Sequence, residues 1–306
     1  MALKDEEPRE SQSVILAATH PWPEVEPCLE SLYEQAQAVG AEVIVADGDG
    51  HALPTDGAAR FPDVVHLLAP GASVFQLRAL AARRASGEIV AVTEDHCRVS
   101  PDWCAQVLEA HRRYPHAAAI GGVVENGAQR RLVDWACFVI PNGPFMRPLR
   151  NGKTRTISLQ ANISYKRWAL EDADAGDGLG LMEMLHNRKL LARGHELVAD
   201  DQLVVEHIQF VTIRSACAMH CHNGRSVAGF RLAQLSFLER LMRLGGCSIL
   251  TFVNLWKTVR PLREKGRLRG RILAALPLSG LLLCCHTAGE FVGYLAGPGW
   301  SPQHLE

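Results

Sequence analysis

The sequence predicts an α/β fold, in which a mostly parallel sheet is flanked by helices and followed by a helical C-terminal appendage. Three observations support this prediction. Strand-like and helix-like stretches alternate through the first half of the chain, as they do in parallel sheets. Acidic residues follow the predicted strands, at the edge where such sheets bind ligands. A basic stretch and then a long apolar stretch fill the C-terminal part.

The first predicted βαβ unit occupies residues 13–46. Ser13–Ala18 is a short apolar run that ends close to two prolines, which is typical of a buried strand. Glu24–Val39 has apolar residues at helical spacing and stops at Gly40. Glu42–Ala46 is a second, β-branched run. We therefore expect two parallel strands joined by a helix.

The alternation continues to residue 124. Val64–Leu68 is a third predicted strand, and Phe75–Ala85 is a predicted helix that ends before a Ser-Gly pair. Glu88–Thr93 is the fourth strand, Pro101–Tyr114 the next helix, and Ala117–Val124 a further strand. No glycine-rich fingerprint follows the first strand and no phosphate loop is present, which argues against a dinucleotide site and a nucleoside-triphosphatase site.

The middle of the chain has a different composition. Arg130–Ser158 is rich in proline and glycine and is predicted to be an irregular, substrate-side loop. Regular structure is expected to return at Gln160–Leu170. Leu179–Arg193 is a predicted helix, and Glu196–Val205 a predicted strand.

The C-terminal part combines charge and hydrophobicity. Leu255–Arg271 carries seven lysines and arginines, and Ile272–Ala296 is nearly all apolar and close to the length of a membrane span. The basic stretch fits an anionic leaflet. Pro277, His286 and Glu290 interrupt the apolar run, and charged groups are costly at bilayer depth. An embedded or interfacial helix pair, a true span and a buried packing helix all remain open.

Composition limits the possible functions. The 306 residues include 32 Lys and Arg against 33 Asp and Glu, so no basic field favours nucleic acid as a partner. Hydrophobic residues at 47% and charged residues at 21% predict a folded globular chain of one large domain, or one domain with an appendage. The nine cysteines are scattered and follow no secretory signal, so we expect free thiols in a reducing cytosol.

Two acidic clusters at strand ends are candidates for chemistry. Glu94, Asp95 and His96 directly follow a buried strand, and carboxylates with an imidazole suit a divalent ion that also holds phosphate oxygens. Asp47 and Asp49 follow the second strand. They fit either a tight acidic turn or hydrogen-bond acceptors for the base or ribose of a nucleotide.

Residues Ser13–His207 resemble a family 2 glycosyltransferase of the GT-A fold. The similar segments, in chain order, are Ser13–Leu16 with Cys28–Leu32, Glu42–Asp49, Arg78–Val90, Glu94–His96, Ala161–Arg167, Met182–Glu183 and Val204–His207. They cover about two thirds of the chain. Each segment is a loose match, but together they occur in the family's order.

The resemblance implies roles for particular residues. The nucleotide-binding candidates are Thr19, Asp47, Asp49, Arg78 and Asp95. The candidate metal ligands are Glu94, His96 and His207. The candidate catalytic base is Glu183, with Asp177 as the rival, and the candidates for diphosphate or acceptor contacts are Asn162, Arg225 and Arg231.

The chain departs from the family pattern in two places. Glu94-x-His96 stands where the family has Asp-x-Asp, and Met182 stands where an acidic residue precedes the base. His207 could equally be a core histidine at a strand end. The segment His220–Arg225 is expected to be a glycine-hinged loop that closes over the diphosphate, with a plain connecting loop as the alternative.

These expectations add up to a membrane-associated, cytoplasm-facing enzyme. The resemblance implies an inverting glycosyltransferase that uses Mn²⁺ or Mg²⁺, a nucleotide-sugar donor and a glycan or lipid-linked acceptor. The alternatives are a nucleotidyltransferase and a membrane-tethered binding protein with a degenerate site. The expected division is a flexible segment 1–12, a GT-A-like domain 13–210, a helical or loop extension 211–254 and a membrane-associating tail 255–306.

Overall fold

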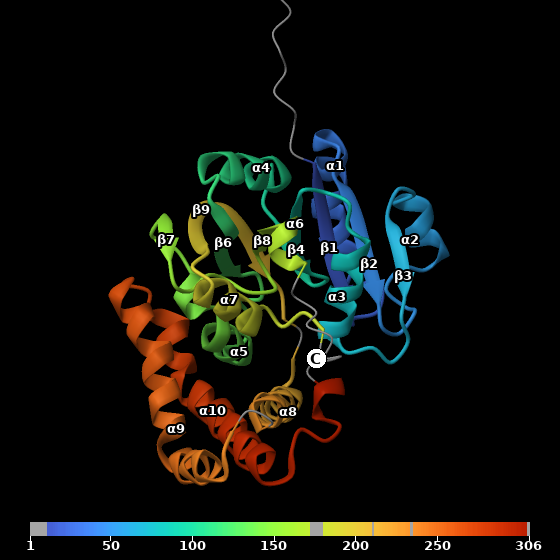
Figure 1. The fold of residues 1–306 in the computed structure, drawn as a ribbon. Helices are drawn as coiled ribbons and strands as arrows, with labels where there is room; N and C mark the ends of the chain where they lie inside the picture. Colours follow the sequence, from blue (N-terminus) through green and yellow to red (C-terminus); the bar gives the residue numbers. More distant parts are fainter. Residues whose placement is uncertain (1–10, 172–179, 210, 233–234, 305–306) are drawn as a thin grey trace, which may run out of the picture. The chain divides into compact units, whose positions relative to one another are not determined.

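The computed structural model describes residues 11–171, 180–209, 211–232 and 235–304 (Figure 1). Most of the expected N-terminal segment 1–12 and the rival base Asp177 lie outside the described residues. The chain divides into two compact units. The first comprises Met1–Val124 and Leu149–Glu206, and the second comprises Glu125–Pro148 and His207–Glu306.

The first unit is built on a nine-stranded sheet in the order β3-β2-β1-β4-β8-β6-β9-β5, with β7 paired to β9. Its strands are β1 (Gln12–Ala18), β2 (Glu42–Asp47), β3 (Val65–Leu68), β4 (Ile89–Glu94), β5 (Cys97–Val99), β6 (Ala117–Asn126), β7 (Gly152–Thr154), β8 (Ile163–Lys166) and β9 (Glu196–His207). The four strands β3, β2, β1 and β4 are parallel, whereas β8 runs antiparallel to β4 and β6. The predicted α/β class is confirmed, and the sheet is partly antiparallel.

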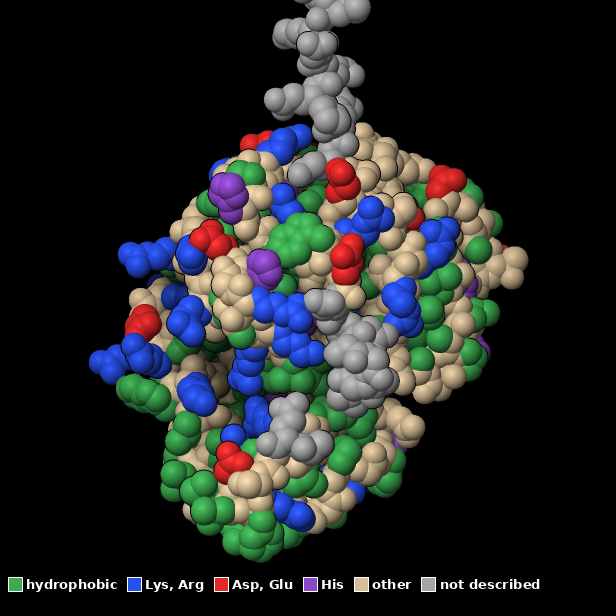
Figure 2. All heavy atoms as spheres, in the orientation of Figure 1, with side chains coloured by type: hydrophobic (Ala, Val, Ile, Leu, Met, Phe, Trp, Pro, Cys, Tyr) green, Lys and Arg blue, Asp and Glu red, His purple; other side chains and the backbone are tan. Residues whose placement is uncertain are grey.

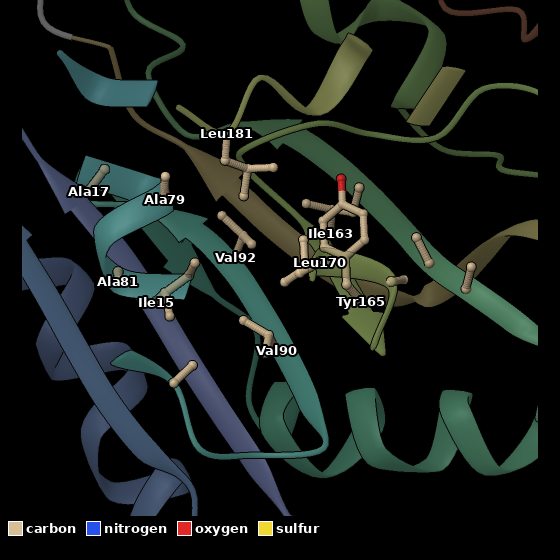
Figure 3. Packing of buried hydrophobic residues seen from close by; sticks show 14 of the residues in the cluster. Ile15, Ala17, Ala79, Ala81, Val90, Val92, Ile163, Tyr165, Leu170 and Leu181 are labelled. Atoms are coloured by element: carbon tan, nitrogen blue, oxygen red, sulfur yellow. The ribbon is translucent and has the colours of Figure 1, made fainter. Parts of the chain in front are cut away.

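Helices cover both faces of this sheet. They are α1 (Glu26–Val39), α2 (Thr55–Arg60), α3 (Val74–Arg84), α4 (Trp103–Arg113), α6 (Arg167–Leu170) and α7 (Glu183–Ala192). Alternate side chains of β1 and β4, such as Ile15 and Val92, pack with Ala79 and Ala81 of α3 (Figure 3). The intervening side chains face α1 and α4. The result is a three-layer arrangement with one apolar core on each side of the sheet.

Local signals set the helix ends in the first unit. Pro27 stands at the start of α1, where its missing N–H costs nothing, and Gly40 ends the helix with a φ of 72°. Ser73 and Gln76 form a capping box at the start of α3. The predicted strands and helices of residues 13–124 are all present, with small shifts at their ends.

The second unit is helical, with α5 (Leu132–Asn142), α8 (Ile213–Leu232), α9 (Phe237–Glu264) and α10 (Gly270–Ala296), and two short 3₁₀ helices, η1 (Gly143–Phe145) and η2 (Ser301–Gln303). Helices α8, α9 and α10 are long, with 20, 28 and 27 residues (Figure 1). Ser236 and Glu239 form the capping box that starts α9. Among the described residues, α10 alone has the length and composition of a membrane span, with a mean hydropathy of 1.7 over 18 residues.

Helices α8 and α10 touch along a seam of glycines. A Cβ atom on Gly224 of α8 would collide with the carbonyl oxygen of His286. A Cβ atom on Gly289 of α10 would collide with the carbonyl oxygen of Cys221, and one on Gly293 would come too close to the carbonyl oxygen of Arg225. The two backbones can approach this closely only because these three residues lack side chains.

Two sequence predictions are wrong. Arg130–Ser158 was expected to be irregular, but it contains α5, whose apolar residues are buried and whose Pro141 lies in the last turn. His220–Arg225 was expected to be a mobile loop, but it lies in the middle of α8. Both predictions took proline or glycine as a sign of a loop. Pro141 is tolerated because it lies close to the helix end, and Gly224 is a packing contact within a helix.

Candidate active site

Polar side chains of the first unit gather at the carboxyl ends of three neighbouring parallel strands. Thr19 and His20 follow β1, Asp47 ends β2, and Glu94 ends β4. Because β1 pairs with both β2 and β4, these residues share one edge of the sheet. This is the edge at which open α/β sheets bind their ligands.

Asp95 is the centre of the cluster. Its buried carboxylate accepts hydrogen bonds from the backbone N–H of Thr19 and of His20, at 2.8 and 2.9 Å. The Nδ1 atoms of His20 and His96 lie 3.1 and 2.7 Å from Asp95 Oδ1. The carboxylate therefore fixes the chain after β1 and orients two imidazole rings, whose centroids are 4.7 Å apart.

The environment of Asp95 favours its ionised form. Burial alone raises its pKa, but the hydrogen bonds from His20 and His96 and the positive charge of those rings lower the pKa far below its ordinary value. Asp95 therefore carries a negative charge at neutral pH.

The same cluster has the ligands of a metal site. One ligand atom from each of His20, Asp95 and His96 lies within 4.8 Å of the others. Imidazole nitrogen with carboxylate oxygen is a donor set that suits Mn²⁺ and related ions. Glu94 stands beside it, with Oε2 3.9 Å from His96 Nε2. The donor chemistry therefore fits a divalent ion.

Arg78 links the end of β4 to the start of α7. Its buried guanidinium lies 3.4 Å from Glu94 Oε1 and 3.4 Å from Glu183 Oε1. The single positive charge of Arg78 thus pairs with two buried carboxylates. Burial raises the pKa of Glu183; the charge of Arg78 opposes the rise, and the charge of Glu94 adds to it.

Asp47 organises the loop after β2. Its carboxylate accepts hydrogen bonds from the backbone N–H of Asp49, Gly50 and Ala52, and lies 3.0 Å from His66 Nε2. Burial raises the pKa of Asp47, but these hydrogen bonds outweigh that effect and the pKa is lowered. Four contacts occupy the four lone-pair directions of a carboxylate. Asp49 is exposed and is the more accessible of the two aspartates.

Thr19 provides a polar atom that the described protein does not satisfy. Its Oγ1 is buried and has no hydrogen-bond partner among the described residues. A buried hydroxyl without a partner is unfavourable, so an atom of a bound molecule could satisfy it. This places a binding feature directly beside Asp95.

Three predicted contact residues are engaged in structural hydrogen bonds. The amide of Asn162 donates to the carbonyl oxygens of Val123 and Leu203 and accepts from Trp103, which ties β6, β8 and β9 to α4. Within the second unit, Arg225 donates to Gly297 O. Arg231, in the same helix, lies 3.5 Å from Tyr294 Oη. Their roles toward the diphosphate or acceptor stay predictions.

The structure adds His20 to the predicted residues. His207 ends β9 and is buried, and it belongs to the second unit, where its ring lies 6.4 Å from that of Phe138. Its role as a ligand stays a prediction. The sequence signal for His20 is its position directly after a buried parallel strand, the same signal that identified Glu94–His96.

Comparisons with known proteins identify the class and then the family. The mannosyltransferase PcManGT from Pyrobaculum calidifontis, solved in complex with GDP-Man and Mn²⁺, matches with a TM-score of 0.53 and 16% identity, over 93% of this chain and 87% of that chain. This likeness defines a GT-A-like fold. The model of glycosyl transferase family 2 matches residues 13–171, which is more than half of the chain. No curated protein matches. The chain belongs to glycosyl transferase family 2 and is a glycosyltransferase.

Proposed function

We propose that this glycosyltransferase transfers a sugar from a nucleotide-diphosphate sugar to an acceptor hydroxyl, with inversion at the anomeric carbon. The observation that carries the proposal is the Arg78 bridge. It joins Glu183, the predicted base, to Glu94 at the end of β4, beside the Asp95 cluster. This contact supports a site in which the predicted base and the predicted donor-binding residues act together.

In the proposed reaction the acceptor oxygen attacks the anomeric carbon as its proton passes to Glu183. The bond between that carbon and the diphosphate oxygen breaks, and its electron pair leaves with the nucleoside diphosphate. The raised pKa of Glu183 suits it to accept a proton. Arg78 acts as a positioning residue, because its contact fixes the orientation of the Glu183 carboxylate.

The donor binds, in this proposal, along the ends of β1, β2 and β4. Thr19 Oγ1 donates to an oxygen of the nucleotide, and Asp49 is available to the base or ribose. A divalent ion, Mn²⁺ or Mg²⁺, would be held by His20, Asp95 and His96, with Glu94 beside them, and would supply positive charge against the diphosphate.

The donor can be identified by thermal stability. A ligand that binds the native state raises stability by mass action, by ~2.7 kcal/mol at a concentration of 100 Kd. We expect one sugar nucleotide to raise the midpoint of unfolding in the presence of Mn²⁺ or Mg²⁺, and the protein to release its nucleoside diphosphate when an acceptor is added. If no sugar nucleotide raises the midpoint under either condition, the proposed function is wrong.

We expect the metal response to depend on the two histidines of the cluster. His96→Ala and His20→Ala should each abolish the increase in donor affinity that Mn²⁺ produces, because each removes one ligand of three. Calorimetric titration of donor with and without the ion measures this. His116→Ala, at an exposed position, is the control. Donor binding that is unaffected by chelator in the native protein would contradict a metal role for the cluster.

We further propose that the acceptor is carried by a lipid or glycan at the cytoplasmic face of a membrane. The apolar helix α10 and the basic residues before it support this association. A lipid-linked acceptor would be concentrated where the enzyme docks.

A further inference from the structure

The outward face of α9 is a stripe of exposed apolar side chains. They follow helical spacing over five turns, with Gly245 at the position between Met242 and Ile249, and no charged residue lies on this face between Leu238 and Trp256. The stripe consists of Leu238, Leu241, Met242, Ile249, Phe252, Val253 and Trp256, with exposed fractions from 39% to 72%. The opposite face, with Cys247, Thr258 and Leu262, is buried in the second unit. This helix is amphipathic with its apolar side facing outward, the reverse of a soluble surface helix.

Helix α10 presents a second face of the same kind. Its outward positions include Leu273, Leu281, Phe291, Val292 and Leu295, all exposed. The acidic residue of this helix, Glu290, is buried and lies 3.2 Å from His286. From Leu273 to Leu295 the outward face therefore carries no charged side chain.

These side chains are concentrated in one unit. Of the exposed large hydrophobic side chains in the described parts of the chain, just Leu68 and Trp168 belong to the first unit. Figure 2 shows hydrophobic side chains gathered over the α9 and α10 part of the visible surface. Contiguous exposed apolar surface of this extent marks an interaction site.

The charges beside the apolar faces identify the partner. Residues 237–271 include nine basic and two acidic residues. Arg243, Lys257, Arg263 and Arg269 are exposed. Trp256, at the end of the α9 stripe, is followed directly by Lys257, and an aromatic ring next to a basic residue is typical of the headgroup region of a bilayer. Apolar faces bordered by positive charge complement anionic phospholipid.

The glycine seam determines how deep α10 can enter. Gly224, Gly289 and Gly293 hold α8 in backbone contact with α10. Helix α8 is polar; it carries Arg214, His220, His222, Asn223, Arg225 and Arg231. If α10 crossed the bilayer, α8 would be carried into the hydrocarbon with it, at a large cost. The outward face of α10 can enter one leaflet, but the helix cannot cross the bilayer.

We propose that the second unit docks on one leaflet of an anionic phospholipid bilayer through the outward faces of α9 and α10, without crossing it. This extends the membrane association proposed above and is independent of the sugar-transfer chemistry. The three possibilities left open by the sequence are thereby reduced to one, an interfacial helix pair. The pair includes α9, whose apolar stripe the sequence did not single out.

The docking face can be tested with vesicles of phosphatidylglycerol and phosphatidylcholine. The purified full chain, without donor, should sediment with them, and the double variant Ile249→Glu with Phe252→Glu should bind at least about tenfold more weakly. Leu68→Glu is the matched control, since Leu68 and Ile249 are both 61% exposed, and it should bind like the native protein. Binding of the double variant at native strength overturns the proposal, as does failure of the native chain to bind.

Two further readouts separate this proposal from its rivals. Protease added outside preformed vesicles should remove epitopes from both ends of the bound chain, whereas protection of the C-terminal epitope would show a span and overturn the proposal. A lipid-free dimer that the double variant dissociates would show that a second copy covers these faces, and would also overturn it. Because neither measurement uses donor or turnover, a failure here is distinct from a failure of the proposed glycosyl transfer.

Discussion

Glu183→Gln is expected to lower turnover by about 10²–10⁴-fold while donor affinity is retained, because glutamine keeps the shape of the side chain but cannot accept the proton. The variant also loses the charge that faces Arg78. Arg78 keeps Glu94 as its partner, so the fold should survive. Turnover is measured as release of nucleoside diphosphate, and donor affinity by calorimetry.

The pH profile provides an independent check on the same residue. Glu183 must be ionised to act as a base, and its pKa is raised, so kcat/KM should fall as the pH drops through a value above 4.5. Glu109→Gln on the exposed surface of α4 is the control. If Asp177→Asn is the inactive variant and Glu183→Gln turns over normally, the base is Asp177 and the assignment of Glu183 is wrong.

Asp95→Ala should have the largest effect on stability, with a loss of about 3–5 kcal/mol in the free energy of unfolding. The substitution leaves two backbone N–H groups and two imidazole rings without their shared acceptor. Urea unfolding measures the loss, and Asp56→Ala on the exposed surface of α2 is the control. We also expect donor affinity to fall, because the chain after β1 loses its anchor.

The stabilisation by Asp95 also has a defined pH dependence. Its pKa is lower in the folded protein than the ordinary 3.8, so the unfolded chain binds the proton more readily. The contribution is complete above pH 3.8 and is lost as the pH falls below it. The native protein should therefore lose stability more steeply than Asp95→Ala below pH 3.8, and equal slopes would contradict the role of this carboxylate.

The sheet was predictable because its central strands are buried on both faces. Ser13–Ala18 and Glu88–Thr93 are continuous apolar runs, and their order with the helices fixes the parallel pairing. Glu94–His96 could be found because it directly follows such a run. The antiparallel pairing of β8 was not predictable, since Ile163–Lys166 is too short to indicate a direction.

The remaining differences have a common cause: contacts between residues far apart in the sequence. The pair Arg78–Glu183 joins positions 105 residues apart, and no local sequence pattern predicts this contact. His20 is a single histidine until Asp95, 75 residues away, orients it. The stripe on α9 has ordinary helical spacing, and only the packing of its opposite face shows that the stripe lies outside.

The contact between α8 and α10 at the glycine seam also determines when the second unit can fold during protein synthesis. Helix α8 leaves the ribosome well before α10, and α9 separates them in the sequence. Until α10 emerges, Gly224 lacks the helix that packs against it, and α5 and α9 also lack this neighbour. The sheet can fold as soon as β9 is translated, whereas the second unit must wait. During that interval the nascent chain exposes the apolar stripe of α9, so a nearby bilayer would meet this surface before the second unit is complete.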